Sequence, residues 1–107
     1  MLLVSKENFA KWLIKEDYKE WSGNGYPSTV PQYVYSIEKV MEKENIKTWS
    51  ELTEHILDLI FKYGKYGPLK NYGEQGHSTI INALERFMDF LINVYDFVPK
   101  LGVWYLH

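Results

Sequence analysis

The 107-residue sequence contains no cysteine and no apolar run long enough for a membrane span. The absence of cysteine excludes a disulfide framework, a thiolate zinc site and a cysteine nucleophile. A membrane-spanning helix needs about 18 or more predominantly apolar residues in succession. The N-terminal MLLV is too short for the core of a signal peptide and is followed at once by charged residues. We therefore expect a cytoplasmic protein that has no membrane-spanning segment.

Positive charge is also scarce. Lys and Arg together number 12 against 14 Asp and Glu, which gives a formal net charge of -2, and Arg86 is the only arginine. A strong nucleic-acid binder usually carries a pronounced basic face, so contacts with phosphates would have to be local. The stretch with Lys65 and Lys70 against Glu74 is slightly positive, whereas the segment before it is acidic.

Apolar and aromatic residues are plentiful. Hydrophobic residues make up 46% of the sequence and aromatic residues 17%, a composition typical of a folded chain rather than a disordered one. A chain of this length is normally one domain with one core. We expect a single helical domain over residues 1–107, with a helical core at 5–95 and a tail at 96–107.

The spacing of the apolar residues predicts an all-α fold, a compact bundle of four helices at about 5–21, 29–45, 49–63 and 78–95. Ser5 is a predicted N-cap, and the pairs Thr29/Gln32 and Thr48/Glu51 fit the capping-box pattern. The last helix shows the clearest three- and four-residue spacing, in Ile80, Ile81, Leu84, Phe87, Met88, Leu91 and Tyr95. Ser78 is expected to cap it, and no strand pattern or internal repeat is present.

A glycine-rich stretch, GKYGPLKNYGEQG, precedes this helix. Its four glycines and one proline predict a loop without a helix or strand, and it lacks the spacing of a phosphate-cradling loop. Two interpretations remain: Lys65, Lys70 and Asn71 contact a phosphate or base, or the stretch is an ordinary connection between helices. The neighbouring tyrosines, Tyr63, Tyr66 and Tyr72, can likewise stack on bases or pack against the helices.

The tail DFVPKLGVWYLH is apolar without clear periodicity, and Pro99 and Gly102 argue against a continued helix. We expect it either to fold back over the bundle or to meet another molecule, with Phe97, Trp104 and Tyr105 in core or dimer contacts.

No constellation of residues predicts catalysis or metal binding. The three histidines show no H-x-x-x-H or H-x-x-E-H spacing. Glu51 and His55 lie four residues apart and are better interpreted as a solvated helix face than as an acid–base pair. Adjacent His77 and Ser78 point in different directions on a helix, which argues against a nucleophile and its base. We expect no enzyme, no cofactor and no metal.

The order of these motifs resembles a known family. Phe9, Trp12 and Leu13 in the first helix are followed by STVPQYVYSI, a short third helix, a polar loop and HSTIINALERFMDFL. This is similar to the N-terminal core-binding, SAM-like domain of tyrosine recombinases and phage integrases, over about residues 5–92. The resemblance implies a four-helix module that grips double-stranded DNA from one side. The catalytic Arg, His-x-x-Arg and Tyr set of that family has no counterpart here, so no recombination chemistry is expected from this chain.

The second and fourth helices of that family commonly face the duplex. By similarity this implies two groups of DNA-contacting residues: Ser28, Thr29 and Gln32, and His77, Ser78, Thr79, Asn82 and Arg86. Together with Lys65, Lys70 and Asn71 they form the predicted DNA-binding site of a non-catalytic module from a phage or other mobile element. The alternative is a small helical regulatory or protein-interaction module that does not bind DNA and self-associates through its aromatic tail.

Overall fold

The computed structural model describes residues 4–25 and 27–99, without the side chains of residues 76 and 77. In these ranges the only regular secondary-structure elements are helices, apart from one isolated β-bridge between Trp21 and Pro27. The helices are α1 (Lys6–Lys15), α2 (Thr29–Glu44), α3 (Trp49–Tyr63), α4 (Lys70–Gly73) and α5 (Gln75–Tyr95). The predicted all-α class is confirmed. The radius of gyration, 13.6 Å, matches the value of about 13 Å for a compact chain of about 100 residues.

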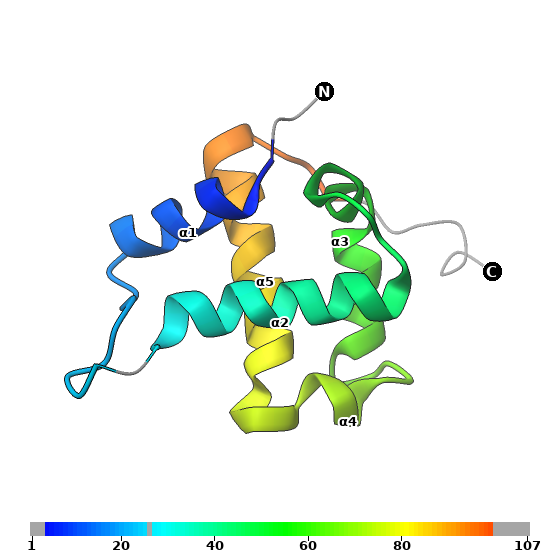
Figure 1. The fold of residues 1–107 in the computed structure, drawn as a ribbon. Helices are drawn as coiled ribbons and strands as arrows, with labels where there is room; N and C mark the ends of the chain where they lie inside the picture. Colours follow the sequence, from blue (N-terminus) through cyan, green and yellow to red (C-terminus); the bar gives the residue numbers. More distant parts are fainter. Residues whose placement is uncertain (1–3, 26, 100–107) are drawn as a thin grey trace.

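The helices pack around α5. Figure 1 shows α2 crossing α5, with α3 beside them, α1 above the N-terminal half of α2, and α4 at the foot of the molecule between α3 and α5. An aromatic cluster joins three of these helices, because the ring of Phe9 in α1 lies 5.3 Å from Phe87 and 5.5 Å from Phe90 in α5, and 6.0 Å from Trp49 in α3. The remaining core is mainly aliphatic, with Leu13, Ile37, Leu52 and Leu84 fully buried.

The prediction for the first helix was wrong at its C-terminus: α1 ends at Lys15 and not near residue 21. Asp17 adopts a left-handed conformation, with φ 69°. The N–H of Tyr18 then donates to the carbonyl of Leu13, and that of Asp17 to Ile14, which is the Schellman arrangement that closes a helix. The residue in the left-handed position is an aspartate rather than the usual glycine, so the sequence carries only a weak stop signal.

The second and third helices lie where they were predicted. At the start of α3, the Thr48 side chain accepts a hydrogen bond from the Glu51 N–H at 3.0 Å, as expected of a capping box. The capping box predicted for Thr29 and Gln32 is absent, and Ser28 occupies the N-cap position without a side-chain bond. Two donors at this end are already used, because the N–H groups of Ser28 and Val30 donate to the carbonyls of Glu20 and Lys19.

The glycine-rich stretch is not a simple loop, which corrects the sequence prediction. The stretch contains the short helix α4. Just before α4, the Leu69 N–H donates a hydrogen bond to the Lys62 carbonyl, which holds the chain beside the end of α3. Two of its glycines lie against the end of α3, where a Cβ at Gly67 or Gly73 would come within 2.2 Å or 2.0 Å of a backbone carbonyl oxygen. These glycines permit close packing.

The last helix starts three residues earlier than predicted, at Gln75. Its N-cap is Glu74, so Ser78 is not the cap; Ser78 lies inside the first turns with φ 65°. After α5, Asp96 is left-handed and the Phe97 N–H donates to the Leu91 carbonyl. Phe97 packs against the core, and the two expectations for the tail concern mainly residues 100–107, which lie outside the described residues. Trp104 and Tyr105 lie outside the described residues.

Candidate nucleic-acid interface

One side of α2 carries polar and aromatic side chains that point away from the core. Gln32, Lys39 and Lys43 follow each other at steps of seven and four residues, so they lie within about 40° of one another around the helix axis. The exposed ring of Tyr35 lies beside them, with the Lys39 ammonium 5.6 Å from its centroid. We call Gln32, Tyr35, Lys39 and Lys43 the α2 face; it extends for about 17 Å at 1.5 Å per residue.

The α2 face continues onto α4 through a tyrosine. The Tyr72 ring centroid is 5.0 Å from the Lys43 ammonium and 6.0 Å from that of Lys39, distances at which cations are attracted to an aromatic ring. Lys70 lies two residues before Tyr72 on the same short helix. Two lysines of α2 therefore approach one aromatic side chain of α4, and Lys70 lies on that same short helix.

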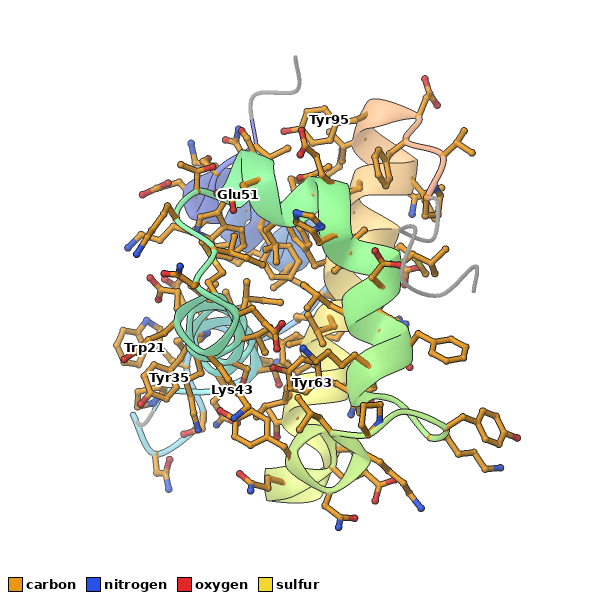
Figure 2. The ribbon with its side chains drawn as sticks, turned by 90° about the vertical axis from the view of Figure 1, so that its right-hand side faces the viewer. Trp21, Tyr35, Lys43, Glu51, Tyr63 and Tyr95 are labelled. Carbon is orange, nitrogen blue, oxygen red and sulfur yellow. The ribbon has the colours of Figure 1, made fainter. Side chains whose placement is uncertain are left out.

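Tyr72 packs against Tyr63, which takes part in a largely buried polar contact. The ring of Tyr72 lies 5.7 Å from the ring of Tyr63, which Figure 2 shows on the inner side of α2, between α2 and α3. The hydroxyl of Tyr63 donates to Glu44 at 2.6 Å, and the Lys62 ammonium donates to the other oxygen of the same carboxylate at 2.8 Å. Because the Glu44 side chain is only 12% exposed, this carboxylate is bound internally and adds little negative charge to the surface.

The protonation states of this contact follow from its geometry. Burial alone would raise the pKa of the Glu44 carboxyl, but the hydrogen bonds from Lys62 and Tyr63 outweigh it, and the pKa lies below its usual value of 4.5. Burial, and then the hydrogen bond to Glu44, raise the pKa of Tyr63 above its usual value of 10.0. At neutral pH the contact between Tyr63 and Glu44 is thus a neutral phenol that donates to a carboxylate.

The segment between α3 and α4 adds a further cation and an exposed ring. Tyr66 is 81% exposed, and the ammonium of the exposed Lys65 lies 5.5 Å from its ring centroid. Asn71 is also exposed, on α4 beside Lys70. Lys65 lies in the segment between α3 and α4, and Lys70 and Asn71 lie on α4. Two of these three predicted residues, Lys70 and Asn71, therefore share a helix with Tyr72, whose ring Lys39 and Lys43 approach.

Two of the three residues predicted at the start of α2, Ser28 and Thr29, lie outside the α2 face. Ser28 and Thr29 are half-buried, and Gln32 is exposed and donates from its side chain to the Pro27 carbonyl at 3.3 Å. The start and end of α2 are about 22 Å apart at 1.5 Å per residue. Only Gln32 among these three belongs to the α2 face defined above.

The predicted residues of α5 form a separate group. Asn82 is exposed, whereas Ser78 and Thr79 are half-buried; His77 lies within α5, and its side chain is outside the described part of the structure. Arg86 forms an ion pair with Asp89 at 3.0 Å. Burial alone would lower its pKa, but the hydrogen bond with Tyr18 and the charge of Asp89 raise it. Arg86 is therefore engaged within the bundle rather than directed only to solvent.

Lys39 and Lys43 are not among the site residues predicted from the sequence. Tyr72, which was considered only as a neighbour of the glycine-rich stretch, is about 30 residues further along the chain. The signal available was the four-residue spacing of the two lysines. Their proximity to Tyr72 depends on the packing of α4, which the sequence interpretation did not include.

Other chemistry has little basis in the described residues. Between residues 4 and 99, leaving aside residue 26, no cluster of three or more His, Asp or Glu side chains could hold a metal ion. Glu51 accepts a hydrogen bond from the Lys47 N–H at 3.4 Å and, with His55, lines a small cavity of about 110 Å³. Among the helices described, none is long and apolar enough to cross a membrane.

Comparisons with protein-family models, with curated proteins and with solved structures found no match for this chain. The functional interpretation therefore depends on the residues and their geometry.

Proposed function

We propose that this chain is a non-catalytic DNA-binding module of the integrase core-binding type, from a phage or other mobile element. In this proposal α1, α2, α3 and α5 are the four helices of a SAM-like bundle, and α4 is a helical turn within the connection before the last one. The observation that carries the proposal is the approach of Lys39 and Lys43 to the ring of Tyr72, on the short helix that also carries Lys70.

The shape of the surface supports contact with a nucleic-acid backbone. Lysines bind phosphates as point charges, and most protein–DNA hydrogen bonds go to phosphate and sugar. The α2 face is about 17 Å long, which corresponds to about five base pairs at 3.4 Å per phosphate along one strand. Gln32 lies at the far end of this face and supplies an amide that can donate or accept.

The charge on this surface is local, in agreement with the net charge of -2 for the whole chain. Four lysines can neutralise about four phosphates: Lys39, Lys43, Lys65 and Lys70. The affinity of a site with about four phosphate contacts falls by roughly 100-fold when the salt concentration rises from 50 to 200 mM. We therefore propose moderate, strongly salt-dependent binding that depends little on base sequence.

A mobility-shift titration of duplex DNA at low salt tests the proposal. The unmodified chain should shift the duplex, and the double variant Lys39→Ala/Lys43→Ala should bind clearly more weakly. The matched control is Lys11→Ala/Lys15→Ala, which removes two exposed lysines with the same four-residue spacing from α1. No shift at ~50 mM salt, or an equal loss in the control variant, would contradict the proposal.

A second candidate is the protein-interaction module. Its support is an apolar groove of about 400 Å³ between α1 and α2, together with the exposed rings of Trp21 (59%) and Tyr35 (63%), which Figure 2 shows on the outer side of α2. Exposed aromatic residues are enriched at protein interfaces. This candidate requires no DNA binding, so the same titration separates the two.

A further inference from the structure

The groove between α1 and α2 has an apolar floor and an acidic rim. The floor is formed by Ala10, Val30, Pro31 and Val34, and the ring of Tyr35 borders it. Glu7, Glu20 and Glu38 supply three carboxylates to the rim, and the one ammonium, that of Lys6, lies 3.8 Å from Glu38. The groove therefore favours an occupant that is apolar and carries positive charge without carboxylates.

A segment of this chain has that chemistry. Residues 100–107, KLGVWYLH, lie outside the described structure and contain Lys100, no aspartate or glutamate, and five apolar or aromatic residues. Trp104 and Tyr105 are the types of residue that most often anchor an interface in a pocket.

This segment is longer than the groove. Eight extended residues reach at most about 27 Å, whereas the α2 wall of the groove, from Val30 to Glu38, is about 12 Å long. In Figure 1, residues 96–99 lead from the end of α5 toward α3, whereas the groove lies between α1 and α2. At residues 96–99 the chain thus heads away from the α1–α2 groove of its own molecule.

We propose that residues 100–107 of one copy bind in the α1–α2 groove of a second copy, with Trp104 on the apolar floor and Lys100 near the rim carboxylates. Reciprocal exchange of two tails then forms a closed dimer. The inference rests on the protein-interaction candidate and does not depend on DNA binding, because its residues are distinct from the lysines around Tyr72.

Sedimentation of the full chain over a range of concentrations, at a salt concentration that weakens DNA contacts, tests this inference. The unmodified chain should dimerise, and Trp104→Ser should weaken dimerisation by about thirtyfold or more, as expected for an anchoring tryptophan. Ala10→Arg fills the groove and should have a similar effect. If this variant fails to fold, Glu7→Lys/Glu20→Lys replaces it, with Glu54→Lys/Glu74→Lys on other surfaces as the control of equal charge.

Mixing the variants gives the decisive result. A groove variant retains an intact tail and the tail variant retains an intact groove, so a mixed dimer keeps one of the two tail–groove contacts. The mixture should therefore dimerise more weakly than the unmodified chain but more strongly than either variant alone. A monomeric unmodified chain, a dimer that persists in Trp104→Ser, or a mixture that dimerises no more than either variant alone would overturn the inference. Since none of these readouts involves DNA, failure here is distinct from failure of the DNA-binding proposal.

Discussion

Gly73 shows how much a single position contributes to the candidate interface. A Cβ at this position would lie 2.0 Å from the backbone oxygen of Tyr63, so α4 could not pack against the end of α3 without moving. Because Tyr72 precedes Gly73, such a movement would also displace the ring that Lys39 and Lys43 approach.

Gly73→Ala should therefore lower the free energy of unfolding by about 1–3 kcal/mol, the usual range for overpacking. The matched control is Gly23→Ala, since a Cβ there meets nothing within 4 Å and should change stability by less than about 0.5 kcal/mol. Urea denaturation of both variants measures the difference. Equal stability of the two variants would contradict the packing described for α4.

The contact between Tyr63 and Glu44 predicts how stability depends on pH. The folded state holds the Glu44 pKa below 4.5, so the unfolded chain binds the proton first as the pH falls, and stability is lost through the folded pKa. The pKa of Tyr63 is raised above 10.0. As the pH rises past 10.0, Tyr63 loses its proton in the unfolded chain before it does so in the folded chain. The folded state therefore becomes less stable again at alkaline pH.

Tyr63→Phe should destabilise the protein by about 1.5–3 kcal/mol at neutral pH, because it removes a hydrogen bond to a charged group. It should also reduce the loss of stability at alkaline pH. Denaturation midpoints over a pH series measure both effects, with Tyr35→Phe, at an exposed position, as the control. If Tyr63→Phe loses as much stability at alkaline pH as the unmodified chain, the Tyr63 hydroxyl does not cause that loss.

At the scale of the helices, the C-terminus of α2 depends on one left-handed residue, Asn45, with φ 58°. Its N–H donates to the Glu42 carbonyl, and that of Ile46 to Met41 at 2.8 Å. A residue with a Cβ and no side-chain amide pays roughly 1–2 kcal/mol in this conformation, whereas glycine does not.

Asn45→Ala should therefore be less stable than Asn45→Gly by about 1 kcal/mol. Thermal unfolding of the two variants provides the comparison, and Glu42→Ala, one turn earlier on the exposed side of α2, controls for the general effect of alanine. If the alanine and glycine variants at position 45 unfold at the same temperature, the left-handed cap does not contribute to stability as described.

The sequence predicted the helices best where both ends carried a chemical signal. α3 has the predicted bounds because Thr48 caps its start and Gly64 follows its end. The end of α1 was missed because Glu16–Trp21 is compatible with a helix and the left-handed residue is Asp17. α4 was missed because Gly67 and Gly73 were interpreted as helix breakers, whereas their role is close contact with α3.

For the candidate site, the sequence pointed to Lys65, Lys70 and Asn71, of which Lys70 and Asn71 lie on α4 beside Tyr72. It could not predict that Lys39 and Lys43 approach Tyr72, because that depends on where the packing of α4 against α3 and α5 places this ring. Of the residues implied by the family resemblance, Gln32 belongs to the same face, whereas Asn82 and Arg86 lie on α5 and Arg86 pairs with Asp89.

At the scale of the whole molecule, two surfaces are proposed as binding sites, and Tyr35 borders both. The lysines around Tyr72 are the proposed DNA contact, and the acidic groove between α1 and α2 is the proposed dimer contact. A rise in salt concentration should weaken DNA binding steeply, because that binding depends on lysine–phosphate contacts. Binding of the tail in the groove should change less, because its contacts are mainly apolar.

The most direct test of DNA binding is the salt dependence of duplex affinity, measured by fluorescence anisotropy. Four lysine–phosphate contacts predict that the logarithm of the association constant falls with the logarithm of salt concentration with a slope of about -3.6, and that Lys39→Ala/Lys43→Ala reduces the slope to about -1.8. Lys11→Ala/Lys15→Ala should leave the slope unchanged. A slope near zero in the unmodified chain, or the same slope in Lys39→Ala/Lys43→Ala as in the unmodified chain, would contradict the proposed interface.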